Sequence, residues 1–211
     1  MMSRSVRAQP SETRRTLPGD ELMADAQSLT HAITIERPRS DVWPWLVQMG
    51  AGRAGWYSYD RIDNGGTPSL DRIAPELQEI AVGDVFPALP GVTEGFVVLG
   101  FHAEHYLILG WPSPAGQPPM TTWAFVLEAP TPGRTRLIVR ARGDDRYRPP
   151  FGLPRFTVNT LVPLGHAIMQ RKQLLGIARR AEAVPWHCVD CSGPIALTDE
   201  PEGITQGAWS S

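Results

Sequence analysis

The chain has 211 residues, of which 42% are hydrophobic and 20% are charged, and its formal net charge is −2. This composition indicates one globular domain, with or without tails, and excludes wholesale disorder. The near balance of charge argues against a nucleic-acid binder that relies on a broad basic surface, and two cysteines are too few for a disulfide-stapled scaffold.

Charge and composition divide the chain into three parts. Residues 1–28 begin with a basic, polar stretch and are predicted to form an arm that is flexible or docked. Residues 29–183 form the predicted domain, and residues 184–211, with four acidic and no basic residues, form a flexible acidic tail. We find no secretory signal and no apolar run that would span a bilayer, so we expect a cytoplasmic protein without stable membrane insertion.

The domain begins with a predicted strand and a short helix. Apolar and polar residues alternate over Leu29–Glu36, as in a half-buried strand, and Pro38 ends this pattern. Ser40 is a suitable N-cap for the helix that follows, and Pro44 would then lie in its first turn. Gly50 ends this helix.

A glycine-rich loop and a series of short strands come next. Leu70–Ile80 is either a second short helix or an ordered loop. Gly and Pro clusters then separate five predicted strands, which suits an antiparallel sheet. These strands are Asp84–Leu89, Phe96–Phe101, Tyr106–Trp111, Thr121–Glu128 and Arg136–Arg142.

A long helix is predicted at the end of the domain. It covers Pro163–Ala183, or it begins near Pro154 and contains Pro163. Its predicted apolar stripe consists of Leu164, Ile168, Leu175 and Ala178. A sheet with one such helix buries the stripe against its concave face, and the short helices would leave a cavity between them.

This order of elements, with its residues, resembles the START-like superfamily, which includes the birch-pollen-allergen, polyketide-cyclase and lipid-transfer groups. The resemblance covers roughly residues 16–183 and is closest to a bacterial branch. It implies an α+β helix-grip fold, in which a curved antiparallel sheet wraps around a long C-terminal helix with an internal cavity. The segments that carry it are LPGDEL at Leu17–Leu22, ITIERPRSDVWPWLVQMG at Ile33–Gly50, GWYSYD at Gly55–Asp60, WAFVLE at Trp123–Glu128, TRLIVRARG at Thr135–Gly143 and IMQRKQLLGIARRAE at Ile168–Glu182.

Aromatic residues are the main candidates for a binding site. They either line a pocket for a ligand or fill an ordinary core, and the resemblance favours the pocket. Gly55–Asp60 is of special interest, because aromatic residues in a glycine-bounded loop are costly to expose. The predicted ligand-binding residues are Gln48, Trp56, Tyr57, Tyr59, Phe96, Trp123, Phe125 and Met169.

Two short patterns suggest other chemistries. Gly50–Gly55 has the spacing G-x-G-x-x-G, but a dinucleotide site needs a strand before the glycines and a helix after them, and here a helix precedes them. A row of arginines, Arg136, Arg140 and Arg142, shares one face of a predicted strand. We expect these arginines to face solvent; on the opposite face, Arg140 or Arg142 would be a buried anion anchor.

A metal site is the third possibility. His102 and Glu104, with the C-x-x-C formed by Cys188 and Cys191, partly match the zinc deaminase pattern H-x-E…P-C-x-x-C. His187 stands where that pattern has Pro, and the cysteine pair lies in the acidic tail. We therefore predict no metal and no other cofactor, keep His187, Cys188 and Cys191 as the metal candidates worth testing, and note that the spacing also permits a reversible disulfide.

We thus predict a protein that binds a small hydrophobic or amphipathic molecule, lipid- or polyketide-like, between the sheet and the last helix. The first alternative is an enzyme similar to polyketide cyclases or dehydratases, in which His166, Tyr57 and Asp60 would act as general acids and bases. The second is a protein-interaction module without a ligand. The sequence leaves enzymatic activity and oligomeric state open, and a carrier is favoured over an enzyme.

Overall fold

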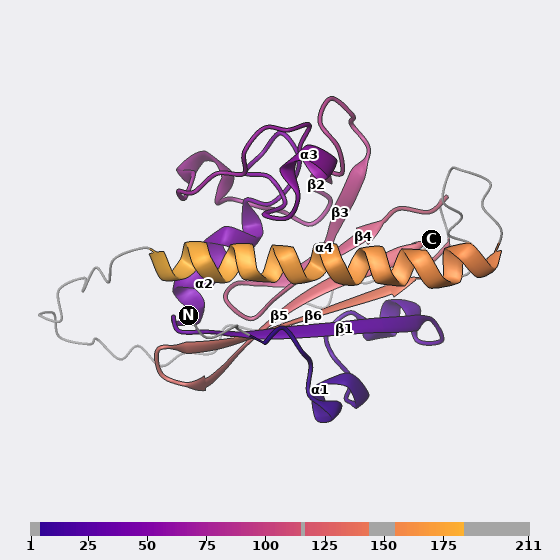
Figure 1. Ribbon diagram of the computed structural model, residues 1–211, viewed down its shortest axis with the longest axis horizontal. Helices are drawn as coiled ribbons and strands as arrows, with labels where there is room; N and C mark the ends of the chain where they lie inside the picture. Colours follow the sequence, from indigo (N-terminus) through magenta and orange to yellow (C-terminus); the bar gives the residue numbers. More distant parts are fainter. Residues whose placement is uncertain (1–4, 115–116, 144–154, 184–211) are drawn as a thin grey trace, which may run out of the picture.

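A computed structural model describes residues 5–114, 117–143 and 155–183, with side chains from residue 164 onward in the last range (Figure 1). Strands fill the middle of the chain and one long helix ends it, which makes the fold α+β. The elements are α1 (Pro10–Arg14), η1 (Asp20–Met23), β1 (Gln27–Ile35), α2 (Arg39–Val47), α3 (Asp60–Asp63), η2 (Pro75–Leu77), β2 (Val85–Pro87), β3 (Gly95–His102), β4 (Tyr106–Trp111), β5 (Thr121–Thr131), β6 (Arg134–Gly143) and α4 (Arg155–Ala183).

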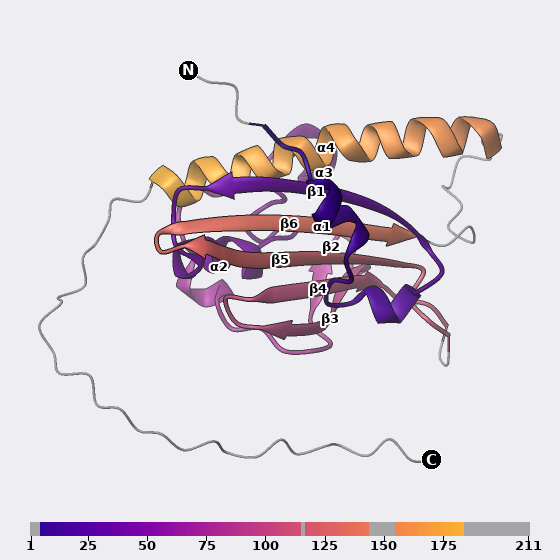
Figure 2. The same ribbon diagram turned by 90° about the horizontal axis from the view of Figure 1, so that it is seen from below.

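The six strands form one antiparallel sheet in the order β1-β6-β5-β4-β3-β2. Alternate residues of each strand point to the same face, and the apolar set of the central strands faces α4 and α2. Helix α4 packs against β1 and α2 and runs along the sheet (Figures 1 and 2). The predicted helix-grip arrangement of a curved sheet and a long C-terminal helix is thus confirmed.

Helix α2 begins earlier than the sequence suggests. Its N-cap is Pro38, so Pro44 lies inside the helix and not in its first turn. Pro38 has the φ of −64° that its ring imposes and an extended ψ, and this allows the helix to start directly after it. The hydroxyl of Ser40 lies 3.5 Å from Asp41 Oδ1 and caps no backbone amide. Farther on, Leu70–Ile80 is mainly an ordered loop that contains the short η2 turn.

The glycine loop between α2 and α3 closes on itself. Gly50 and Gly55 exchange two backbone hydrogen bonds of 3.2 and 2.9 Å, and Ala51 donates to Pro87 O at 2.9 Å. The guanidinium of Arg53 donates to the carbonyls of Val47 and Met49 at the end of α2. These hydrogen bonds lie within the loop and at the C-terminal end of α2. A dinucleotide fingerprint instead needs the glycine loop at the N-terminal end of a helix, so this loop does not have that geometry.

Helix α4 begins at Arg155, so the longer of the two predicted helices is the observed one, and Pro163 lies within it. The predicted apolar stripe is wrong in its first half. Leu164 is 56% exposed and Ile168 is 49% exposed, whereas Gln170 is only 2% exposed. The buried face of α4 carries Gln170, Gln173, Leu174, Ile177, Ala178 and Ala181. Helix α4 is therefore turned so that Gln170 and Gln173 face the interior. This orientation is possible because the two glutamine side chains have hydrogen-bond partners there.

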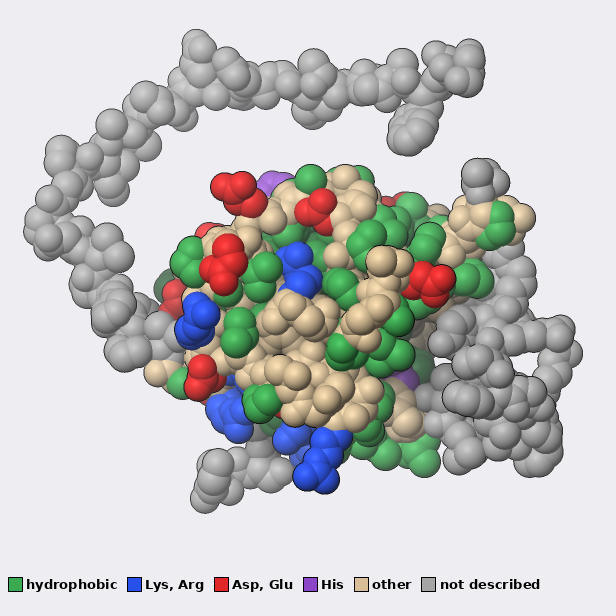
Figure 3. All heavy atoms as spheres, turned by 90° about the horizontal axis from the view of Figure 1, so that it is seen from above, with side chains coloured by type: hydrophobic (Ala, Val, Ile, Leu, Met, Phe, Trp, Pro, Cys, Tyr) green, Lys and Arg blue, Asp and Glu red, His purple; other side chains and the backbone are tan. Residues whose placement is uncertain are grey.

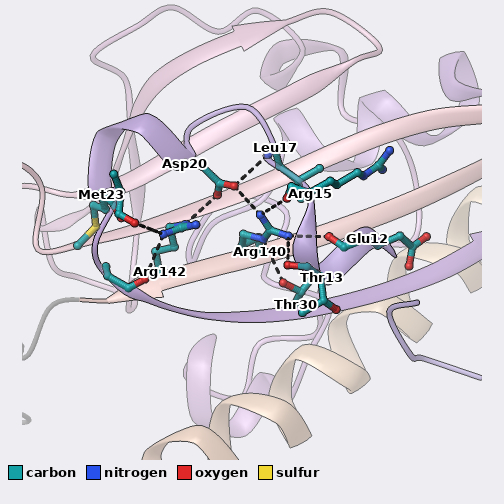
Figure 4. Close-up of polar contacts among 11 residues, drawn as sticks. Glu12, Thr13, Arg15, Leu17, Asp20, Met23, Thr30, Arg140 and Arg142 are labelled. Carbon is teal, nitrogen blue, oxygen red and sulfur yellow. Dashed lines mark hydrogen bonds and ion pairs between the residues drawn. The ribbon is translucent and has the colours of Figure 1, made fainter. Parts of the chain in front are cut away.

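The N-terminal arm, residues 5–26, lies across the outer face of the sheet (Figure 2). Glu12 accepts from Arg136 at 2.7 and 2.9 Å, and one carboxylate oxygen of Asp20 accepts from Arg142 at 2.8 Å. The other oxygen of Asp20 binds Arg140. Figure 4 shows the two arginines Arg140 and Arg142 beneath the arm, surrounded by its carboxylate and carbonyl groups.

The expectation that these arginines face solvent is therefore wrong. Arg140 is 2% exposed, and besides Asp20 it binds the carbonyls of Glu12 and Arg15. The reason is tertiary, because the arm supplies acceptors that a single strand does not reveal. Strand parity itself is as expected, with Leu137 and Val139 on the inner face.

Candidate functional site

A cluster of aromatic rings lies on the concave face of the sheet. Trp123 of β5 is at its centre, stacked on Trp56 with ring centroids 5.4 Å apart and next to Phe96 at 5.3 Å. Phe96 in turn makes an edge contact with Trp111 of β4 at 5.4 Å. Strand alternation places Trp111 and Trp123 on the inner face, and the glycine-bounded loop brings in Trp56.

Two histidines continue this cluster toward β1 and α4. His166 of α4 lies 6.4 Å from the ring of Trp123, and His31 of β1 lies 6.0 Å from the ring of His166. The two meet because α4 runs alongside β1 in the same direction, so that farther on Glu36 N reaches Glu182 Oε1 at 2.8 Å. We refer to His31, Trp56, Phe96, Trp111, Trp123 and His166 as the aromatic–histidine site.

Both imidazoles are neutral at physiological pH. Burial lowers the pKa of His31, and burial together with the neighbouring His31 lowers the pKa of His166 to about 4. The Nδ1 atom of each ring is buried and has no hydrogen-bond partner among the described residues. Such unsatisfied buried groups are rare in folded proteins and need an explanation.

A chain of amides holds the other side of the site. Trp123 Nε1 donates to Gln170 Oε1 at 2.9 Å, and Gln170 Nε2 donates to Gln173 Oε1 at 2.8 Å. Residues 166, 170 and 173 share one face of α4 by helical spacing. This explains why a polar helix face points toward the sheet, and it fixes the orientation of Trp123.

The opposite end of the concave face is closed. Tyr57 has a positive φ of 60°, and its hydroxyl accepts a hydrogen bond from Gln48 Nε2 at 2.8 Å. Burial raises the pKa of Tyr57, and the guanidinium of Arg180 lies 4.7 Å from the centre of its ring. Gln48 Oε1 accepts from Ala74 N at 3.0 Å. These polar groups are satisfied within the protein.

The structure brings some of the predicted ligand-binding residues together and separates others. Trp56, Phe96, Trp123 and Phe125 form one ring cluster. Tyr59 is 40% exposed on the surface, and Lys172 Nζ lies 5.8 Å from its ring. Among the predicted residues, Phe96, Trp123 and Met169 are half-buried, whereas Gln48, Trp56, Tyr57 and Phe125 are buried.

The three residues named for an enzymatic reading have separate partners. His166 lies beside His31, and the hydroxyl of Tyr57 binds Gln48. Asp60 Oδ1 accepts from Ser69 Oγ, which also accepts from the backbone N–H of Tyr57. The three side chains therefore do not converge on one point among the contacts of the described residues.

Sequence reasoning did not identify His31, Trp111, Gln170 and Gln173. His31 has the same parity as Ile33 and Ile35, and this alternation was available as a signal that its side chain faces inward. Gln170 and Gln173 lie one and two turns after His166, but their inward orientation depends on how α4 is rotated against the sheet.

The predicted metal candidates His187, Cys188 and Cys191 lie outside the described residues. Within the described part of the chain, no group of three or more His, Cys, Asp and Glu residues is placed to hold a metal ion. His102 and His105 lie in the β3–β4 turn, where each Nδ1 is within 3.1 Å of Ala103 O.

A separate open cleft of about 530 Å³ lies on the outer face, between the arm and the edge of β1 and β6. Arg136 contributes to it, but its guanidinium is bound to Glu12, Thr34 and the carbonyl of Arg7. The lining residues are Ser5, Arg7, Ala8, Gln9, Pro10, Thr34, Glu36 and Arg136. The helices of the described residues include none that is long and apolar enough to cross a bilayer.

The fold combines a six-stranded antiparallel sheet, a short helix after the first strand and a long C-terminal helix. This arrangement is a helix-grip fold. No protein-family profile matches the sequence, and no curated protein is similar to it.

Solved structures with this kind of fold share little sequence with the chain. The protein MLL2253 of Mesorhizobium loti is 16% identical, over 74% of this chain and 97% of its own, with a TM-score of 0.45. A polyketide-cyclase-like protein of Corynebacterium glutamicum is 15% identical over 76% and 94%, with a TM-score of 0.37. CalU16 of Micromonospora echinospora is 16% identical over 86% and 94%, with a TM-score of 0.36.

Proposed function

We propose that the protein binds a small hydrophobic or amphipathic molecule between the concave face of the sheet and residues 164–173 of α4. The observation that carries the proposal is the contrast between the two ends of this face. At one end Trp45 and Tyr57 are buried, with exposed fractions of 0% and 2%. At the other end the aromatic–histidine site is only half-buried, apart from Trp56.

Exposure of apolar groups around the site supports this proposal. Leu29 of β1, two residues before His31 on the same face, is 38% exposed. Aromatic rings left partly in contact with water gain free energy when an apolar molecule covers them, at about 25 cal/mol per Å². A ligand that buries about 200 Å² of apolar surface would therefore gain about 5 kcal/mol before the costs of binding.

Native mass spectrometry of protein purified from its own host, compared with the denatured mass, tests whether an organic molecule is bound.

Equilibrium dialysis with naphthalene as an apolar probe tests where in the protein an apolar molecule binds. Trp123→Ala should weaken naphthalene binding about tenfold, because it removes the central ring of the cluster. Trp43→Ala is the matched control, since Trp43 lies on α2 and its ring contacts Phe101 at 6.3 Å. If naphthalene binds both variants equally, Trp123 belongs to the core and the proposed place is wrong.

A second candidate is acid–base catalysis in the same place, because two ionisable side chains border the aromatic rings. General base catalysis is most efficient when the pKa of the base is near the working pH. The pKa of about 4 makes His166 a weak base at neutral pH, which favours binding over turnover. Incubation of the protein with enolisable ketones in heavy water tests this candidate, and faster deuterium exchange that His166→Phe abolishes would support it.

A further inference from the structure

We propose that the two histidines of the aromatic–histidine site form a polar subsite for an uncharged hydroxyl group, so that the ligand is a hydroxylated apolar molecule and not an acid. This inference rests on the proposed function and specifies the chemical class of the ligand. It starts from two nitrogen atoms, His31 Nδ1 and His166 Nδ1, that are buried without a hydrogen-bond partner in the described part of the chain.

The chemistry of neutral imidazole favours a hydroxyl. Each neutral ring has one nitrogen that donates and one that accepts, and a hydroxyl group both donates and accepts. The ring centroids are 6.0 Å apart and inclined by 46°, so the two imidazoles are neighbours, and no hydrogen bond joins their Nδ1 atoms. A single hydroxyl placed there satisfies groups that are otherwise left unpaired at a cost.

An anionic head group finds no fixed cation at this subsite among the described residues. The arginines of the neighbouring strand, Arg140 and Arg142, are on the outer face and are bound to Asp20. On α4, Arg171 and Lys172 are exposed. The indole of Trp123 lies beside His166, and its N–H donates to the amide oxygen of Gln170. A carboxylate would lose its hydration here without a compensating charge.

Aromatic rings complete the recognition of the ligand. Trp56 and Trp123 are stacked, and Phe96 makes an edge contact with Trp56 and lies beside Trp123. Trp111 makes an edge contact with Phe96. These rings suit an apolar body next to the hydroxyl. The ligand class that matches both parts is an uncharged apolar molecule with one hydroxyl group at an end.

Equilibrium dialysis of the full chain at pH 7.5 with three probes tests the inference: naphthalene, 2-naphthol and 2-naphthoate. A hydroxyl makes a molecule less hydrophobic, so 2-naphthol binds more tightly than naphthalene only if the hydroxyl finds a partner. We expect a preference of about fivefold to tenfold for 2-naphthol over naphthalene, and the weakest binding for 2-naphthoate.

Two independent variants locate the preference, so that failure of one to fold does not end the test. His31→Phe and His166→Phe should each reduce the preference for 2-naphthol over naphthalene to less than about twofold, because each removes one imidazole of the subsite. The matched control is His102→Phe, since His102 is exposed in the β3–β4 turn, and it should keep the full preference. Circular dichroism checks that each variant is folded.

The outcomes separate the inference from the proposed function. If naphthalene binds but 2-naphthol shows no preference, or if the preference survives both histidine variants, the hydroxyl subsite is wrong and the apolar site remains. If 2-naphthoate binds most tightly, the ligand is an acid and the inference is overturned. If none of the three probes binds, the proposed function fails and the inference fails with it.

Discussion

At the scale of single residues, the aromatic–histidine site is defined by neutral polar groups in apolar surroundings. His31 and His166 are kept neutral mainly by burial, and the Trp123 indole is held by an amide. A second buried ionisable group lies elsewhere, at Asp63 of α3, which is 7% exposed. These groups make the stability of the protein depend on pH in opposite directions.

Acid should destabilise the protein through His166. The pKa of His166 is about 4 in the folded protein and about 6.5 in the unfolded chain, so the unfolded state binds more protons between these values. The free energy of unfolding should therefore fall as the pH decreases from about 6.5 to about 4, by up to about 3 kcal/mol from this group.

Urea denaturation of the wild type and of His166→Phe across this pH range checks the prediction. The variant should lose less stability on acidification. Parallel pH profiles for the two proteins would contradict the assignment. His102→Phe serves as the control, and its profile should follow the wild type.

Asp63 should act in the opposite sense. Burial and the nearby Asp60 raise the pKa of Asp63 to about 6, so its ionised form is disfavoured in the folded protein at neutral pH. Asp63→Asn should therefore stabilise the protein at pH 7.5, by about 1 kcal/mol after allowance for solvent screening. The gain should disappear near pH 4, where Asp63 is already neutral. Denaturation at both pH values measures the effect, and Asp25→Asn at an exposed position is the control.

At the scale of elements, the packing of α4 against the loop that follows α2 depends on one glycine. A Cβ atom at Gly176 would lie 2.3 Å from Tyr57 O, whereas one at Gly165 on the same helix would meet no atom within 4 Å. Arg180 continues the contact, with hydrogen bonds to the carbonyls of Leu70 and Ser69. The loop and the helix therefore fit only if position 176 has no side chain.

Gly176→Ala should destabilise the protein by about 2–3 kcal/mol, because the added methyl group forces the helix and the loop apart. Gly165→Ala is the matched control and should be neutral or stabilising by up to about 1 kcal/mol, since alanine favours the helix. Thermal and urea denaturation compare the two. Equal effects of the two substitutions would show that α4 does not pack against Tyr57 as described.

At the scale of the whole molecule, the N-terminal arm and the sheet are joined by charge pairs on the outer face. Asp20 binds both Arg140 and Arg142 (Figure 4). Glu12 binds Arg136. The guanidinium groups also hold several backbone carbonyls of the arm. The surface on the opposite side of the molecule shows apolar side chains interspersed with charged ones (Figure 3).

Asp20→Ala should destabilise the protein by about 3 kcal/mol, because it leaves buried guanidinium groups without their carboxylate. It should also release the arm, so that trypsin cleaves more rapidly after Arg14 and Arg15. Glu21→Ala is the matched control at the neighbouring exposed position. Denaturation and limited proteolysis measure both effects. An unchanged rate of cleavage in Asp20→Ala would mean that the arm is held by other contacts.

The local pattern of apolar and polar residues in the sequence predicted most of the helices and strands. The strand Tyr106–Trp111 has the predicted bounds, and β5 and β6 contain their predicted strands. Strand period and glycine or proline boundaries depend on neighbours in sequence, so one chain is enough to read them. The start of α2 was less accurate, because capping at Pro38 depends on backbone angles that side-chain type only biases.

The sequence by itself determined the order of the elements, the inward parity of the strands and the presence of several aromatic residues among them. Only the tertiary structure decided which faces meet. The rotation of α4 brings His166 to His31 and Gln170 to Trp123, and the arm covers Arg140. The physical reason is that hydrogen bonds and charge pairs between distant segments outweigh the local preference of a helix to bury only apolar residues.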